Sequence, residues 1–233
     1  MTYSCYLFDL AGTLVDSLLD LHQAVNHVVT SRGLDALSVD VVRTYIGDGV
    51  KVLLARSLLG REGPTTEENR SAILADLVAR ASETDDLDEG LAQFRAFYID
   101  HVVDNTQCYE GVRETLDALR SQGAAMGVVS NKPEAPTRKI LDKLEIVDYF
   151  GAVVGGDTVD AIKPDPSPVL HALDILGQKN STTLMVGDSA NDILSGLRAG
   201  CDVAAVTYGF TPRETLAAHE PGRLVDRISA LLD

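Results

Sequence analysis

Positive charge is scarce in this sequence. Lysine and arginine total 20 against 35 aspartates and glutamates, which gives a formal net charge of −15 at pH 7. Non-specific binding to nucleic acid or to an anionic membrane requires a basic surface, so this balance argues against both kinds of partner. An anionic substrate would need a local cation in such an acidic protein.

Cysteines and long apolar segments are also few. Cys5, Cys108 and Cys201 are widely spaced and form no Cys-x-x-Cys pair, which is typical of reduced thiols in a cytosolic protein. No stretch approaches the ~18 apolar residues of a membrane span, and no basic leader precedes an apolar run at the N-terminus. We therefore expect a soluble, cytoplasmic protein.

The composition is that of a globular chain. Of the 233 residues, 45% are hydrophobic and 24% are charged, close to the average for folded proteins. The length exceeds the usual single domain of about 100–150 residues, but it is short for two independent domains. One core that carries an insertion is the natural interpretation.

Short apolar runs alternate with helical patterns along most of the chain. Continuous apolarity is typical of strands that are buried on both faces of a parallel sheet. These runs cover residues 6–8, 126–129, 152–154, 184–186 and 203–206. Helical patterns cover residues 112–119, the segment that Pro133 opens, and residues 168–176 and 193–199. The alternation predicts an α/β fold with a doubly wound parallel sheet.

About a hundred residues separate the first apolar run from the second. Helical periodicity fills this interval, with Leu18, Leu21 and Val25 on one face of an early helix and Leu87 and Leu91 on a later one. We predict that residues 17–105 form an inserted helical cap. Residues 1–16 and 106–233 would together form the core.

Polar residues follow four of the apolar runs. In parallel α/β sheets, ligands bind beyond the carboxyl ends of the strands, so these residues are expected at one edge. The loops concerned cover residues 9–13, 130–132, 155–164 and 187–192. They would bring carboxylates, hydroxyl and amide donors, and a lysine together.

This set of side chains suits phosphoryl transfer. Asp9, Asp188 and Asp192 offer the oxygen ligands that Mg²⁺ prefers. An aspartate beside the metal can attack phosphorus and form an aspartyl-phosphate, which splits the reaction into two steps.

The phosphate oxygens would be satisfied by neighbouring donors, namely Lys163, Ser130, Asn131 and the N–H groups of the turn at Gly12. Two alternatives stay open. Helix N-capping explains Asn131 and Ser189 nearly as well, and Thr13 could be a turn hydroxyl or could orient Asp9.

At this point the sequence resembles a known group, the haloacid dehalogenase superfamily. Its four motifs are similar to residues 8–17, 130–133, 163–164 and 187–192, in the same order and spacing. Further segments resemble the phosphoglycolate phosphatase branch, namely residues 45–49, 155–157, 199–201 and 207–209. The resemblance covers the whole chain and implies a Rossmann-like core beneath a mobile helical cap.

The resemblance also implies roles for individual residues. Asp9 would be the nucleophile and a Mg²⁺ ligand, and Lys163 would neutralise it and the transferring group. Asp188 would ligate Mg²⁺, with Asp192 as a further ligand or as outer support. The expected substrate contacts are Gly12, Thr13, Ser130, Asn131 and Lys132 in the core, with Gly49 and Lys51 in the cap.

One position departs from the family pattern. The motif reads Asp-x-Asp-Gly-Thr, and Ala11 replaces its second aspartate. The missing carboxyl would act as general acid and base, a contribution of roughly 10²–10⁴-fold. Alanine keeps the backbone carbonyl that the family offers to the metal, so we expect Mg²⁺ and phosphate binding with slow turnover.

Three explanations of Ala11 stay open. The alanine was introduced to disable the enzyme, or it is natural in a weak or regulatory phosphate-binding protein, or the reaction differs. In the third case the resemblance would be to phosphonoacetaldehyde hydrolases, which cleave a C–P bond through a cap lysine, here Lys51.

The overall prediction is a Mg²⁺-dependent phosphatase for a small phosphorylated metabolite. By resemblance the leading substrate is 2-phosphoglycolate. A monomer or a homodimer would fit the sequence equally.

Overall fold

The computed structural model describes residues 3–59, 70–82 and 86–233. The chain divides into two compact units. The core unit comprises Met1–Ser17 and Thr106–Asp233, and the helical unit comprises Leu18–Asn105. The role of the helical unit as a cap stays a prediction.

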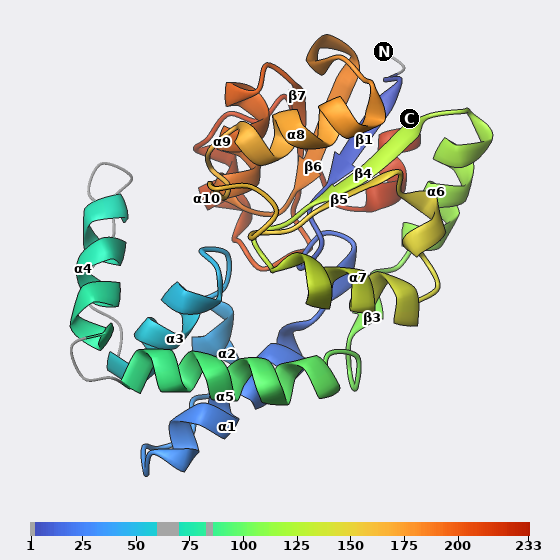
Figure 1. Ribbon diagram of the computed structural model, residues 1–233. Coiled ribbons are helices and arrows are strands. Elements are labelled where there is room, and N and C mark those ends of the chain that lie inside the picture. The colour runs from blue at the N-terminus through green and yellow to red at the C-terminus, as the bar shows by residue number, and fades with distance from the viewer. Residues whose placement is uncertain (1–2, 60–69, 83–85) are drawn as a thin grey trace. The chain divides into compact units, whose positions relative to one another are not determined.

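A six-stranded sheet forms the centre of the core unit (Figure 1). In spatial order its strands are β5 (Ala152–Val154), β4 (Ala125–Val129), β1 (Cys5–Phe8), β6 (Thr183–Gly187), β7 (Asp202–Val206) and β8 (Arg223–Val225). All neighbouring strands run parallel. The prediction of an α/β fold with a doubly wound parallel sheet is confirmed.

The position of β1 inside the sheet explains why its residues are continuously apolar. β1 pairs with β4 on one side and β6 on the other, with Tyr6 opposite both Met126 and Leu184. Helices α8 (Ser167–Leu176) and α9 (Ala190–Arg198) contribute Val169 and Ile193 to the apolar cluster that contains Leu7. Burial of both strand faces removes the alternation that a half-exposed strand would show.

Further helices of the core unit are α6 (Val112–Ser121), α7 (Glu134–Lys143) and α10 (Arg213–Ala217). Pro133 caps the N-terminus of α7, so it opens this helix as predicted. Helix α9 begins at Ala190, earlier than the predicted residue 193. The reason is a capping box, in which the Ser189 hydroxyl and the Asp192 carboxylate satisfy each other's backbone N–H groups.

Three short strands were not predicted from the sequence. β8 lies at the edge of the sheet, and only Val225 of its three residues is buried. β2 (Val15–Asp16) and β3 (Gln107–Cys108) form a separate antiparallel pair of two residues each. Such segments are too short to show a periodic pattern.

The helical unit contains α1 (Leu18–Ser31), α2 (Val39–Arg43), α3 (Val50–Leu59), α4 (Arg70–Ser82) and α5 (Asp86–Asp100). Val25 in α1 and Leu91 in α5 belong to its buried apolar faces. The buried Asp20 carboxylate accepts hydrogen bonds from the backbone and side-chain N–H groups of Asn105. These hydrogen bonds join the first turn of α1 to the last residue of the unit.

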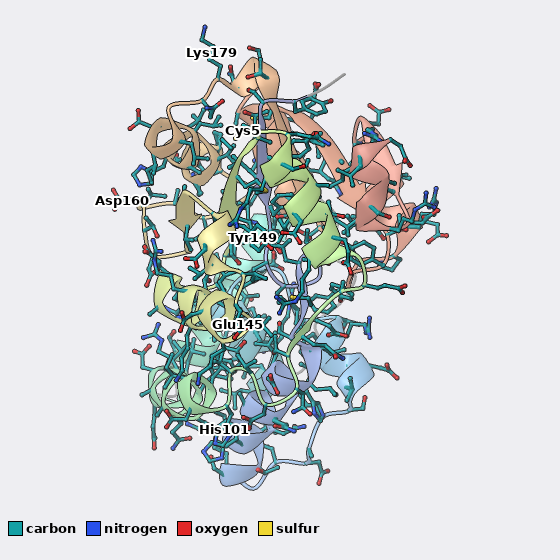
Figure 2. All side chains as sticks on the ribbon, turned by 90° about the vertical axis from the view of Figure 1, so that its right-hand side faces the viewer. Cys5, His101, Glu145, Tyr149, Asp160 and Lys179 are labelled. Atoms are coloured by element: carbon teal, nitrogen blue, oxygen red, sulfur yellow. The ribbon has the colours of Figure 1, made fainter. Side chains whose placement is uncertain are left out.

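Two of the cysteines are buried, and all three carry free thiols. Cys5 lies on β1, where Figure 2 labels it. Burial raises the pKa of the Cys5 thiol to about 11 and that of the Cys201 thiol to about 12. These thiols are therefore inert at neutral pH. None of the helices in residues 3–59, 70–82 and 86–233 combines the length and apolarity that a membrane span requires.

We expect Leu7→Ala to lower the free energy of unfolding by about 2–5 kcal/mol, because it opens a cavity in the centre of the sheet. Leu7 is fully buried, whereas Leu170 on α8 is 45% exposed and serves as the matched control. Leu170→Ala should stay within about 0.5 kcal/mol of the parent. Urea unfolding of the three proteins measures both effects, and equal losses would contradict this account of the core.

Candidate active site

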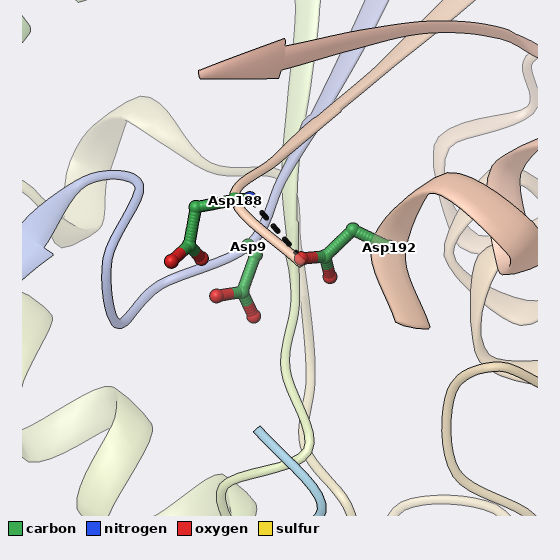
Figure 3. Close-up of side chains that lie close together, drawn as sticks. All are labelled: Asp9, Asp188 and Asp192. Atoms are coloured by element: carbon green, nitrogen blue, oxygen red, sulfur yellow. Dashed lines mark hydrogen bonds between the residues drawn. The ribbon is translucent and has the colours of Figure 1, made fainter. Parts of the chain in front are cut away.

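Three buried carboxylates meet at the carboxyl edge of the sheet. Asp9 follows β1, Asp188 follows β6, and Asp192 lies in the first turn of α9. β1 and β6 are parallel neighbours, so their ends coincide in space. Each carboxylate offers an oxygen within 4.8 Å of the others. Figure 3 shows the three side chains grouped together.

A buried lysine from a fourth loop completes this cluster. Lys163 is 2% exposed, and its ammonium lies 2.8 Å from Asp9 Oδ1 and 2.6 Å from Asp192 Oδ1. It also donates to the Val129 carbonyl at 2.5 Å. An ammonium has three protons to donate, and these contacts use all three.

Burial and neighbouring charges shift the titration of the cluster. Burial raises the pKa of Asp9 to about 6, although the Lys163 ammonium opposes the rise. Burial also raises the pKa of Asp188 well above its ordinary value, and the carboxylates of Asp192 and Asp9 add to that rise. For Lys163, burial acts to lower the pKa, but Asp192 and Asp9 outweigh it and raise the value to about 12.

The charges of this cluster fit a divalent cation. Three carboxylates face one ammonium, so negative charge is in excess. Lys163 pairs with two of them, Asp9 and Asp192. A hard dication such as Mg²⁺ takes carboxylate oxygens as ligands and would balance the remaining charge.

Asp192 differs from the other two carboxylates in its hydrogen bonding. Its Oδ1 accepts from Lys163, and its Oδ2 accepts from the Asp188 N–H at 3.2 Å, the Ser189 N–H at 3.0 Å and the Ser189 hydroxyl at 2.6 Å. A carboxylate has about four acceptor positions. Because all are in use, Asp192 suits the supporting role better than that of a direct metal ligand.

Asp188 is held by two loops of the core unit. The Thr13 hydroxyl donates to its Oδ1 at 3.4 Å, and the Phe210 N–H donates to its Oδ2 at 2.8 Å. The hydroxyl of Thr13 is therefore a partner of Asp188. Gly12 has φ +93°, and a Cβ at this position would lie 2.2 Å from Asp188 Oδ2. Only glycine fits here.

The loop from Ser130 to Lys132 lies beside Lys163. The Asn131 side chain accepts from the Lys163 N–H and donates to the Lys163 carbonyl, both at 2.9 Å. Asn131 is not a helix cap, because Pro133 occupies that position, whereas Ser189 does cap α9. Ser130 is buried, and its hydroxyl accepts a hydrogen bond of 3.3 Å from the Lys132 N–H.

The remaining predicted residues lie outside this cluster of contacts. Ala11 is half-buried in the turn after β1, where it forms an isolated bridge with Val15. Gly49 and Lys51 belong to the helical unit, where Gly49 has φ +84° and Lys51 is exposed in the first turn of α3. Their part in substrate binding stays a prediction.

The sequence prediction missed the supporting role of the loop after β7. Besides the Phe210 N–H, this loop provides the Tyr208 hydroxyl, which donates to the Thr13 carbonyl at 2.8 Å. At Gly209 a Cβ would lie 2.4 Å from both the Asp188 Cβ and the Gly12 carbonyl oxygen. The apolar run at residues 203–206 was the available signal, because it places the next residues at the same sheet edge.

The Rossmann-like fold and this acidic cluster together are typical of haloacid dehalogenase-like hydrolases. The family model of haloacid dehalogenase-like hydrolases matches residues 6–206. The chain belongs to this family.

Relatives of known name place it further within the superfamily. Phosphoglycolate phosphatase 1 of Pseudomonas aeruginosa is 36% identical over 97% of this chain and 77% of that protein. The phosphoglycolate phosphatase of Aquifex aeolicus is 38% identical over 88% of this chain and 84% of that protein. The expected similarity to phosphoglycolate phosphatases, as phosphoric monoester hydrolases, is confirmed.

Solved structures agree with these relatives. The crystal structure of a predicted phosphoglycolate phosphatase from Haemophilus somnus superposes with a TM-score of 0.84 at 30% identity. The match covers 100% of this chain and 97% of that one.

The raised pKa values predict a pH-dependent response to Mg²⁺. Folding raises the pKa of Asp9 from 3.8 to about 6, so the metal-free protein should lose stability as pH rises through this interval. A cation that needs the ionised carboxylates should stabilise the fold more at pH 7.5 than at pH 5. Thermal unfolding with and without Mg²⁺ measures the difference, and Asp188→Asn should abolish it. A Mg²⁺ effect that is equal at both pH values would contradict the assignment.

Tyr208→Phe should weaken Mg²⁺ binding, because the turn that carries Asp9 and Thr13 loses the hydroxyl that holds it. We expect a cost of about 0.5–1.5 kcal/mol in unfolding free energy, the usual contribution of one hydrogen bond. Tyr149→Phe is the matched control, since that hydroxyl donates to Asp117 Oδ1. Titration calorimetry with Mg²⁺ should show weaker binding for Tyr208→Phe alone.

Proposed function

We propose that this protein is a Mg²⁺-dependent phosphatase that hydrolyses a small phosphate monoester through Asp9, with 2-phosphoglycolate as the leading substrate. The observation that carries the proposal is the contact between the Lys163 ammonium and the buried Asp9 carboxylate at the sheet edge. The names of the relatives support the choice of substrate.

In the first step, one Asp9 carboxylate oxygen attacks phosphorus. A P–O bond forms to Asp9 while the P–O bond to the leaving group breaks, and the leaving alkoxide takes a proton. The Lys163 ammonium lies at hydrogen-bonding distance from Asp9. It would neutralise the carboxylate and the negative charge of the transferring group.

In the second step, water attacks the aspartyl-phosphate. Inorganic phosphate leaves, and the Asp9 carboxylate is regenerated. Asp9 and Asp188 would hold Mg²⁺ together with the Ala11 carbonyl, with Asp192 as supporting residue or further ligand. When bound, Mg²⁺ would supply positive charge that stabilises the transferring phosphoryl group.

Substrate binding would draw on the loops around the cluster. Ser130 and Lys132, with the turn at Gly12 and Thr13, are the proposed phosphate contacts, and Asn131 belongs to the same loop. Gly49 and Lys51 are the proposed contacts from the cap. The phosphate would thus meet donors whose positions are fixed before it arrives.

Ala11 leaves the proposed site without a general acid and base. Its methyl group offers no proton to the leaving alkoxide and takes none from the attacking water, so both transfers fall to solvent. We therefore expect the protein to bind Mg²⁺ and phosphate well but to turn over its substrate slowly.

Ala11→Asp should raise the turnover of phosphate esters by roughly 10²–10⁴-fold in the presence of Mg²⁺, because it restores a general acid and base. Ala11→Asn is the matched control, since it has nearly the same shape and cannot transfer the proton. We would measure kcat and KM for 2-phosphoglycolate and a panel of sugar phosphates and nucleoside monophosphates. No gain on any ester would count against the phosphatase and favour a non-catalytic phosphate-binding protein.

A separate trapping experiment addresses C–P cleavage. If Lys51 formed an imine with phosphonoacetaldehyde, borohydride would fix the substrate covalently to the chain, and Lys51→Ala would prevent this. Covalent labelling at Lys51 would overturn the phosphatase proposal.

A further inference from the structure

The side-chain amide of Asn131 makes two hydrogen bonds to the backbone of Lys163. Asn131 Oδ1 accepts from the Lys163 N–H, and Asn131 Nδ2 donates to the Lys163 carbonyl, each at 2.9 Å. Two parallel hydrogen bonds between one side chain and one residue fix both distance and orientation. Asn131 thereby joins two loops that are 32 residues apart in the sequence.

The backbone of Asn131 is itself held firmly. The Gly156 N–H donates to the Lys132 carbonyl at 2.9 Å, and a Cβ on Gly156 would lie 2.4 Å from the Asn131 carbonyl oxygen. The Asp157 carboxylate accepts from the Glu134 N–H at 2.7 Å, at the start of α7. The loop after β5 therefore packs against the Asn131 backbone and hydrogen-bonds to the residues that follow it.

The hydrogen bonds of Asn131 fix the position of the Lys163 backbone. Its side chain is buried, and its ammonium must reach the Val129 carbonyl together with the carboxylates of Asp9 and Asp192. A small displacement of the Lys163 backbone would move the ammonium out of reach of at least one of these oxygens. If that oxygen belonged to Asp9 or Asp192, a buried carboxylate would lose its counter-ion, at a high cost in free energy.

We propose that Asn131 is a positioning residue, whose side-chain amide holds Lys163 in the acidic cluster and does not contact the phosphate itself. This inference rests on the proposed function and refines the role of one of its residues. The alternative is that the Asn131 amide binds phosphate directly.

A double-mutant cycle with inorganic phosphate distinguishes the two roles. In the presence of Mg²⁺, Asn131→Ala and Lys163→Met should each weaken phosphate binding roughly tenfold. If Asn131 acts through Lys163, adding Asn131→Ala to Lys163→Met should produce no further loss. An equal tenfold loss in both backgrounds would overturn the proposal.

The control is Asn180→Ala. Asn180 also ties its side chain to a backbone carbonyl, that of Ala199, at 3.0 Å. Its loss should leave phosphate binding unchanged, since Asn180 has no contact with Lys163 among the described residues. Should Asn131→Ala fail to fold, Asn131→Asp keeps the acceptor for the Lys163 N–H and removes the donor.

A second readout needs no phosphate. Buried Lys163 should resist acetylation by acetic anhydride in the folded parent and in Asn180→Ala, but should become reactive in folded Asn131→Ala. Mass spectrometry of the peptide that contains Lys163 measures this. A parent that binds no phosphate would refute the proposed function alone, whereas a protected Lys163 in Asn131→Ala would refute the positioning role.

Discussion

The contact on which the site depends is the ion pair between the Lys163 ammonium and the carboxylates of Asp9 and Asp192. Burial of an ionised group costs several kcal/mol unless a partner of opposite charge compensates it. Lys163 compensates part of the negative charge of three buried aspartates, and the remainder matches the needs of a divalent cation. Burial raises the pKa values of Asp9 and Asp188, and the neighbouring carboxylates add to the rise. Electrostatics therefore link the fold of the sheet edge to its chemistry.

Backbone groups, besides the side chains of Lys163, Thr13 and Ser189, keep this charge in place. The Phe210 N–H fixes Asp188, and the N–H groups of Asp188 and Ser189 fix Asp192. These loops approach so closely that a Cβ at Gly12 or Gly209 would collide with Asp188. Donors that are held by the main chain need no reorganisation when charge develops, which is the arrangement that electrostatic catalysis requires.

In the proposed mechanism, Ala11 separates the neutralisation of charge from the transfer of protons. In the proposed mechanism, charge neutralisation would depend on Asp9, Asp188 and Lys163, and all three lie together in the structure. Proton transfer would depend on position 11, where a methyl group stands. The geometry of binding and the supply of protons can therefore vary independently in this protein.

Part of this picture was readable from the sequence, because it depends on residues that are adjacent in the chain. The apolar run at residues 152–154 has the same bounds as β5, and Asp9 and Asp188 each follow a strand directly. The edge strand β8 was not predicted, because only Val225 of its three residues is buried and the segment has no apolar run, although it pairs with β7.

The sequence by itself thus determined the parallel sheet and the residues at its carboxyl edge, since strand burial leaves a local signature. Only the tertiary structure decided that Asn131 holds Lys163, that Thr13 reaches Asp188, and that the loop after β7 supports the site. These contacts join residues between 22 and 175 positions apart. No local pattern encodes such partners, because they are set by how the strands are ordered in the sheet.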